Sequence, residues 1–205
     1  MPKYRATLKD KRKKRVKMRR YGGRFAALPI DEQIDRRAVA RREILLVGPI
    51  DQTVHYYLAR LLHYMVGESK ERITITLNPP GGTLPDGLAV YDLITNIAKR
   101  VPIHIVGTGA CMSMGVIILQ AATKRYATRN TSFLLHELQG INVGTLGQQK
   151  DVHGEMLRLQ STLNDILAER TGLSKKELTK LYERQEKFLD VDEAKKYNLI
   201  DGVIE

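Results

Sequence analysis

Short hydrophobic runs alternate with helical patterns along most of the chain. Four runs have the length of buried strands, at residues 43–48, 72–78, 101–107 and 131–137. Runs of this length that are rich in β-branched residues favour extended structure. Strands that alternate with helices pair in parallel through right-handed crossovers. The pattern therefore predicts an α/β fold with parallel sheets and flanking helices.

Apolar residues that recur three and four positions apart predict the helices between these strands. Asp51 can cap the first helix, and a second helix follows the strand at 72–78. The apolar positions are Val54, Tyr57, Leu58, Leu61, Leu62, Met65 and Val66 in the first helix and Leu88, Tyr91, Ile94 and Ile97 in the second. Residues 113–122 are apolar on every side, which predicts a helix that is buried all round.

The last third of the chain has a different pattern. Between residues 149 and 170, a narrow apolar seam is formed by Val152, Met156, Leu159, Leu163 and Ile166. Such a seam is typical of a helix that packs against another helix. The pattern alone fits a neighbour in the same domain or in another subunit, and we expect another subunit. Ser174 with Glu177, and Asp190 with Glu193, have the spacing that starts two further helices.

The excess of positive charge lies in the first 24 residues. They contain twelve Lys or Arg residues and one acid, Asp10, whereas the rest of the chain contains 22 residues of each sign. Residues 1–24 are therefore expected to form a flexible tail and residues 25–205 a single domain. Such a tail can bind nucleic acid, an anionic membrane or an acidic partner, or it can be a solvated or processed leader. Only Tyr4 and Tyr21 accompany it, so nucleic acid is not an expected partner.

The composition argues against several classes of protein. No apolar stretch approaches the roughly 20 residues of a membrane-spanning helix. The single cysteine, Cys111, rules out an intrachain disulfide framework and a Cys-rich zinc site. The basic start is not followed by the apolar region of a signal peptide. We therefore expect a reducing, soluble compartment, with no metal, no cofactor and no membrane partner.

Two segments join strands to helices in a way that suits chemistry. The turn Asn-Pro-Pro-Gly-Gly at 78–82 has glycines whose N–H groups can approach a ligand and bind an oxyanion, although an ordinary turn has the same composition. Ser113 opens the fully apolar helix after the strand ending at Val106. A serine there is usually a cap, but a nucleophile on a sharp strand-to-helix turn has the same position.

His136 is the third candidate, at the end of the strand at 131–137. Ligand sites in open α/β sheets lie at the carboxyl ends of parallel strands, so we expect His136 to lie near Ser113 and the glycine turn. Neighbours on a strand point to opposite faces, so Glu137 does not orient His136. A third member of a triad must therefore come from later in the chain.

Four motifs resemble those of the proteolytic subunit of the Clp protease, the ClpP-like serine peptidase family. They are TLNPPGGTLPDGLAVYD at 76–92, GACMSMG at 109–115, KRYATRNTSFLLHE at 124–137 and FLDVDEAKKYNLID at 188–201. Their order and spacing hold across about residues 43–205. The combination is specific, although each motif alone would be weak.

The resemblance implies a crotonase-like α/β fold with a protruding helix–strand handle at 140–170. It implies a serine endopeptidase in which Ser113 is the nucleophile, His136 is the base, and the N–H groups of Gly82 and Met114 form the oxyanion hole. It also implies stacked heptameric rings, possibly with paralogous subunits, and an AAA+ unfoldase that delivers unfolded proteins. The sequence has no G-x-x-x-x-G-K-[ST] motif, so the partner must hydrolyse the ATP. The cytoplasm is the expected location, or the plastid stroma in a photosynthetic eukaryote.

The acid is the largest departure from the family pattern, which has Asp two residues before a phenylalanine. Aligned from Phe188 the third triad member is Glu186, whereas aligned from Glu183 it is the uncharged Gln185. Glu186 is preferred because a carboxylate stabilises the imidazolium. Other departures from the pattern are Pro79, Cys111, Met112, Glu137 and Leu138.

Three other functions stay open. A non-active or weakly active ring subunit would keep the fold and lack a working triad. A crotonase-type acyl-CoA enzyme would share the fold and a backbone oxyanion hole, but it would not need Ser113 or His136. A nucleic-acid-binding role would rest only on the tail.

Overall fold

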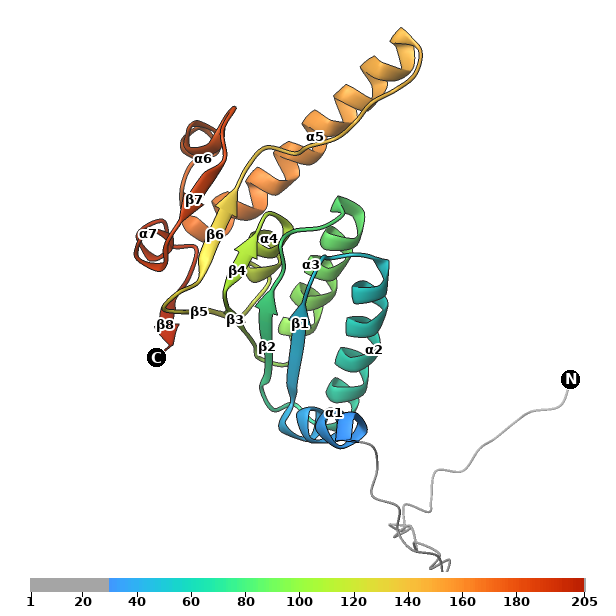
Figure 1. Ribbon diagram of the computed structural model, residues 1–205, viewed down its shortest axis with the longest axis vertical. Coiled ribbons are helices and arrows are strands. Elements are labelled where there is room, and N and C mark those ends of the chain that lie inside the picture. Colours follow the sequence, from blue (N-terminus) through green and yellow to red (C-terminus); the bar gives the residue numbers. More distant parts are fainter. Residues whose placement is uncertain (1–29, 205) are drawn as a thin grey trace, which may run out of the picture.

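The larger of two β-sheets forms the centre of the protein, a computed structural model of which describes residues 30–204 (Figure 1). The basic tail expected at 1–24 lies outside the described residues. The sheet has five parallel strands in the order β1-β2-β3-β5-β8. They are β1 (Glu43–Val47), β2 (Ile73–Asn78), β3 (Ile103–Gly107), β5 (Lys124–Thr128) and β8 (Gly202–Ile204). The three predicted strands in this sheet are confirmed, and β5 and β8 are additional.

Alternation of residues along each strand separates the two faces of this sheet. Ile73, Ile75 and Leu77 of β2 are fully buried, whereas the threonines between them are only half-buried. The helices α2 (Gln52–Glu68) and α3 (Leu84–Ala98) pack side by side over the buried face (Figure 1). A further helix, α1 (Ile30–Arg41), precedes β1 and was not predicted from the sequence.

The smaller sheet contains the strands that end directly before Ser113 and His136. It consists of β4 (Ala110–Met112), β6 (Ser132–Leu135) and β7 (Lys187–Leu189). β4 and β6 are parallel, whereas β6 and β7 are antiparallel. The expectation of purely parallel pairing is therefore wrong for this sheet. Strands of three or four residues are too short to give a hydrophobic period, so the sequence pattern did not reveal β4 or β7.

The long helix α5 (Leu146–Thr171) projects from the body of the protein (Figure 1). It starts at a capping box made by Thr145 and Gln148 and ends at Gly172, whose φ of 78° is left-handed. The predicted seam is divided: Leu163 and Ile166 belong to the core of this chain, whereas Val152 is exposed. The prediction that the seam packs against another subunit is therefore wrong for Leu163 and Ile166.

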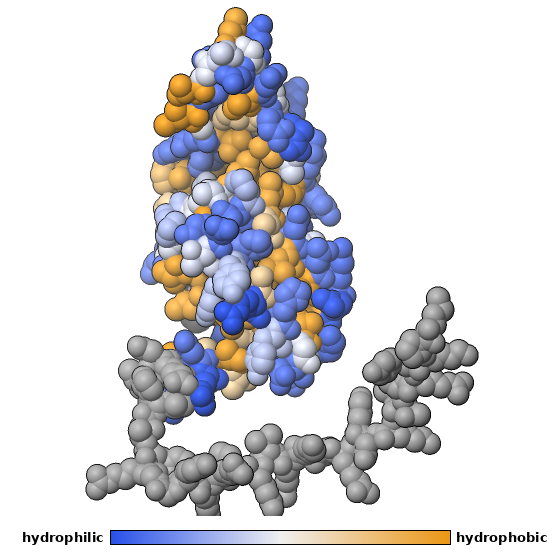
Figure 2. Space-filling view, turned by 90° about the vertical axis from the view of Figure 1, so that its right-hand side faces the viewer, coloured by the Kyte–Doolittle hydropathy of each residue, from blue (hydrophilic) through white to orange (hydrophobic). Residues whose placement is uncertain are grey.

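The expected strand of the handle is not formed within the described residues. Residues 136–145 contain no strand, and they run beside α5 (Figure 1). Hydrophobic side chains lie exposed at this projecting end (Figure 2), and Ile141 and Val143 are 96% and 89% exposed. Soluble proteins rarely leave such side chains grouped in water, so this end has the character of a contact surface. Among residues 30–204 no helix is both long enough and apolar enough to cross a membrane.

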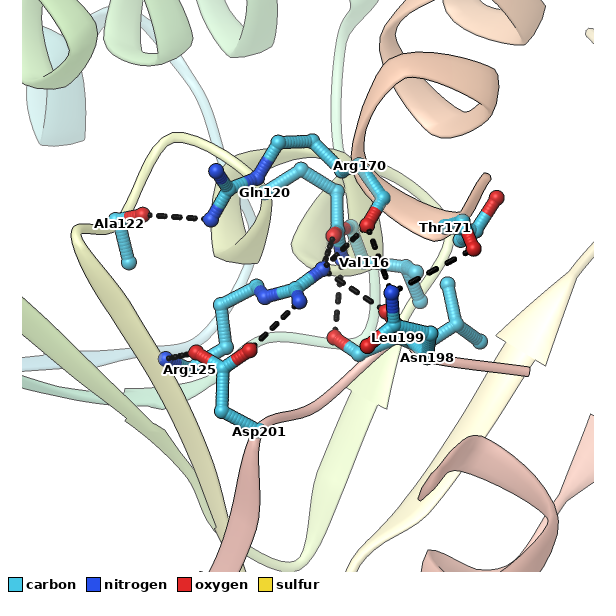
Figure 3. Close-up of polar contacts among 9 residues, drawn as sticks. All are labelled: Val116, Gln120, Ala122, Arg125, Arg170, Thr171, Asn198, Leu199 and Asp201. Carbon is cyan, nitrogen blue, oxygen red and sulfur yellow. Dashed lines mark hydrogen bonds and ion pairs between the residues drawn. The ribbon is translucent and has the colours of Figure 1, made fainter. Parts of the chain in front are cut away.

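Two short helices, α6 (Lys175–Tyr182) and α7 (Val191–Lys196), begin at the predicted capping boxes. After α7 the chain is tied to the larger sheet by the buried Arg125 (Figure 3). The Arg125 guanidinium donates to the carboxylate of Asp201 at 2.6 Å and to the carbonyl of Asn198 at 2.9 Å. It also donates to the carbonyl of Arg170 at the end of α5 at 3.2 Å. One side chain therefore joins β5, α5 and the C-terminal segment.

Candidate active site

One cavity of about 410 Å³ brings together four of the five predicted site residues. Ser113, His136, Gly82 and Met114 all line it. Glu186 does not line it, and lies exposed directly before β7. The cavity wall also includes the apolar side chains of Leu84, Ile117, Leu134, Leu163 and Leu167. The predicted convergence of the glycine turn, the serine and the histidine is therefore present.

Ser113 lies on a sharp turn between β4 and the buried helix α4 (Met114–Leu119). Its φ of 52° and ψ of −118° are unfavourable for a residue with a side chain. The backbone is held by the Ser113 N–H group, which donates to the carbonyl of Leu134 at 2.9 Å. The Ser113 hydroxyl makes no capping hydrogen bond, so the turn exposes it to the cavity instead of using it to stabilise the helix. The prediction that Ser113 directly follows the strand ending at Val106 is wrong, because the short strand β4 lies between β3 and the serine.

The glycine turn lies directly against this serine. A Cβ atom placed on Gly81 would be 3.0 Å from Cβ of Ser113 and 3.4 Å from its Oγ. Gly81 also has a φ of 126°, which residues with side chains rarely adopt. At Gly82 an added Cβ would be 2.1 Å from the carbonyl oxygen of Ile50. Both positions therefore require glycine.

The N–H groups of Gly82 and Met114 are free of protein acceptors among residues 30–204. Gly82 forms a parallel bridge with Ile50, in which Ile50 bonds to Gly81 and Thr83. In such a bridge the N–H group of the central residue, here Gly82, points away from the partner strand that contains Ile50. The Met114 N–H group is one of the unpaired donors at the start of α4. Both residues line the cavity, so these two donors can bind a negatively charged oxygen there.

His136 follows the end of β6, next to the parallel strand β4 that leads to Ser113. Its Nδ1 donates to the backbone carbonyl of Glu137 at 2.6 Å, which leaves Nε2 as the basic nitrogen. Within the described residues no hydrogen bond joins His136 to Ser113 or to Glu186. The histidine is therefore in the cavity and in a tautomer that can accept a proton.

The ladder between β6 and β7 helps to choose between Glu186 and Gln185, the two candidates for the third triad member. Its last pair is Leu135 with Lys187, so the next pair in the same register is His136 with Glu186. Residues that are opposite in an antiparallel pair have Cβ atoms about 4.5–5.5 Å apart on one face. Gln185 is engaged elsewhere, because its Nε2 donates to the carbonyl of Leu181 at 3.0 Å. The register therefore favours Glu186 over Gln185.

A polar network at one end of the cavity was missed by the sequence analysis. The Leu138 N–H group donates to Gln160 Oε1 at 2.6 Å, and Gln160 Nε2 donates to Asn164 Oδ1 at 3.0 Å. The Tyr182 hydroxyl donates to the same oxygen of Asn164. Burial raises the pKa of Tyr182 to about 12, so this hydroxyl stays protonated. The available signal for this network was Asn164, a polar residue next to the seam residue Leu163 that is buried in the structure.

The unusual residues before Ser113 have structural roles. Cys111 is fully buried, and burial raises the pKa of its thiol to about 12, so it does not compete as a nucleophile. The carbonyl of Pro79 accepts the Met112 N–H group at 3.1 Å, and the Pro79 ring leaves no space for a Cβ at Gly115. Among residues 30–204 no group of three His, Cys, Asp or Glu side chains is arranged to hold a metal ion.

Comparison with known proteins identifies the family of the chain and agrees with its fold. The family model for Clp protease matches residues 30–205. A mutant of ClpP1 from Listeria monocytogenes has 28% sequence identity to the chain and a TM-score of 0.77, over 84% of this chain and 96% of that one. A match that covers most of the chain, on the same α/β fold, confirms the resemblance of the motifs. The chain therefore belongs to the Clp protease family.

Proposed function

We propose that the chain is an active serine endopeptidase that hydrolyses unfolded proteins. In this mechanism Nε2 of His136 removes the proton of Ser113, whose Oγ attacks the carbonyl carbon of the scissile peptide bond. The N–H groups of Gly82 and Met114 stabilise the tetrahedral oxyanion. His136 then protonates the leaving amine, and a water molecule hydrolyses the acyl-enzyme by the same route. Glu186 stabilises the imidazolium as the third triad member.

The strained turn at Ser113 is the observation that carries this proposal. A backbone outlier of this kind costs about 1–3 kcal/mol, and a serine that merely capped α4 would not need it. The turn leaves the hydroxyl without a capping bond, in the same cavity as a histidine and two free N–H donors. These are the parts that acyl transfer requires.

We further propose that the chain acts in stacked heptameric rings fed by an AAA+ unfoldase. The family generally forms rings and works with such unfoldases. The exposed Ile141 and Val143 at the projecting end supply an apolar surface for contacts between subunits. The sequence has no nucleotide-binding motif of its own, which assigns ATP hydrolysis to the partner. The expected location of this assembly is the cytoplasm, or the plastid stroma in a photosynthetic eukaryote.

A fluorophosphonate probe and a fluorogenic peptide test the peptidase directly. The assembled protein should be labelled on Ser113 and should cleave the peptide. Ser113→Ala should lose both signals, on the order of 10⁴-fold or more in turnover, while its assembly stays the same by light scattering. Undiminished cleavage by Ser113→Ala would refute the assignment.

A non-active or weakly active ring subunit is the second candidate function. It is favoured by two observations: His136 bonds to the carbonyl of its neighbour, and Glu186 lies outside the cavity. In that case the pure protein would assemble into rings and show neither labelling nor cleavage. Adding an active paralogue would then restore cleavage only through the paralogue's own serine.

A further inference from the structure

His136 and Glu186 occupy the first positions beyond the end of a β-ladder. The last ladder pair between β6 and β7 is Leu135 with Lys187. On that side the two segments are fixed by backbone hydrogen bonds. On the other side no strand continues, because residues 183–185 form a turn at the end of α6. No ladder hydrogen bond therefore joins the two segments beyond this pair.

Glu137 makes a second connection between the two segments. Its Oε2 accepts a hydrogen bond from the backbone N–H group of Arg184 at 3.0 Å. The bond spans 47 positions in the sequence and joins the residue after His136 to the turn before Glu186. The pair of interest therefore lies between two fixed points, the end of the ladder and this contact.

The turn needs such a contact. Arg184 has a φ of 57°, a left-handed conformation that is unfavourable for a residue with a side chain. The neighbouring N–H groups are satisfied within the turn, since Glu183 donates to Thr179 and Gln185 donates to Tyr182. The Arg184 N–H group has no backbone acceptor among residues 30–204. The Glu137 carboxylate supplies the acceptor and so holds the turn in its left-handed form.

The position of Glu137 itself is also fixed. The next residue, Leu138, donates its N–H group to Gln160 of α5. Through Asn164, Gln160 is connected to Tyr182, the last residue of α6. The segment after His136 and the end of α6 are therefore anchored to the same helix. Glu137 adds a direct bond between this segment and the turn that leads to Glu186.

We infer that Glu137 is a positioning residue: its carboxylate accepts the Arg184 N–H group, fixes the turn, and so holds Glu186 opposite His136. This inference rests on the proposed peptidase function. It also assigns a role to Glu137 as one of the residues that depart from the family pattern. The charge of Glu137 is not essential to that role, because the bond requires only an oxygen acceptor of the same reach.

Kinetics of five variants test the inference. Glu137→Met keeps the length of the side chain and removes the acceptor, so we expect kcat to fall about 10- to 100-fold with little change in KM. Glu137→Gln keeps an acceptor oxygen and should recover most of this loss. Glu183→Met is the matched control, because Glu183 is also exposed, lies on the same turn, and its side chain has no partner among the described residues. The fourth variant is Glu186→Gln, and the fifth combines Glu137→Met with Glu186→Gln.

The double variant separates positioning from a general structural effect. If Glu137 acts through Glu186, its substitution should change kcat by less than about twofold once Glu186→Gln is present. Fully additive losses would overturn the inference, and so would wild-type kcat in Glu137→Met. Loss of assembly by Glu137→Met but not by Glu183→Met, measured by light scattering, would make the contact purely structural and would also overturn it. A wild-type protein that is not labelled on Ser113 would instead refute the peptidase function, and this inference with it.

Discussion

Gly81 and Ser113 are in direct contact: a Cβ atom on the glycine would lie 3.0 Å from Cβ of the serine and 3.4 Å from its Oγ. The two residues come from different sheets, since Gly81 follows β2 and Ser113 follows β4. The contact fixes the distance between the free N–H group of Gly82 and the candidate nucleophile. It explains why the turn at 78–82 has no space for a side chain at this point.

Substitution of Gly81 should therefore impair the site. We expect Gly81→Ala to slow fluorophosphonate labelling of Ser113 by at least about tenfold, because the methyl group displaces the serine and strains the left-handed backbone. The control is Gly147→Ala on α5, where an added Cβ meets nothing within 4 Å. Equal labelling rates in the two variants would show that Gly81 does not position Ser113.

Two substitutions decide which residue is the third triad member. The ladder register predicts that Glu186→Gln lowers kcat, because an amide can hydrogen-bond to the imidazolium but does not neutralise its charge. Gln185→Asp should leave the rate within about twofold, since its side chain is directed to α6. Both variants are measured with a fluorogenic peptide. A higher rate for Gln185→Asp, with no effect of Glu186→Gln, would reverse the assignment.

The contact between Arg125 and Asp201 should make stability depend on pH. Burial by itself would raise the pKa of Asp201, but the hydrogen bonds from Arg125 lower it below the ordinary value of 3.8. The carboxylate therefore stabilises the fold above that value, and this stabilisation is lost as the pH falls through the lowered pKa. We expect Asp201→Asn to reduce the free energy of unfolding by about 2–3 kcal/mol at neutral pH, because Arg125 loses its counter-charge.

Urea unfolding at neutral and acidic pH measures this effect, and the difference from the wild type should shrink under acid. Asp192→Asn is the control, because its pair with Arg129 is two-thirds exposed on both sides and should contribute less than about 1 kcal/mol. Equal destabilisation by the two variants would contradict the structural role of Arg125.

The two parts of the projecting helix segment should respond differently to substitution. Replacing the exposed Ile141 and Val143 by aspartate should give smaller assemblies of folded subunits, because the charges disrupt an apolar contact surface. Leu163→Ala should instead destabilise the subunit itself by about 2–5 kcal/mol, since Leu163 belongs to its core. Light scattering and thermal unfolding separate the two effects. Unchanged assembly in the aspartate variant would place the contacts between subunits elsewhere.

Much of this protein could be predicted from local sequence. A clear hydrophobic pattern marks the strands β1, β2 and β3 and the helices α2 and α3. The capping boxes of α6 and α7 are complete within four residues. Ser113, His136 and the glycines were found because their chemistry depends on short motifs at the ends of such elements. These signals are local, so no tertiary information is needed to find them.

Only the tertiary structure decided how the parts meet. The antiparallel pairing of β6 with β7, whose register favours Glu186 as the partner of His136, depends on residues that are about 50 positions apart. The same is true of the bond between Glu137 and Arg184, which joins residues on two exposed segments. The α5 seam shows the same limit: one spacing runs along the whole helix, yet Leu163 is in the core and Val152 is exposed. A hydrophobic pattern specifies which side of a helix is buried, but the packing of the whole chain determines what covers it.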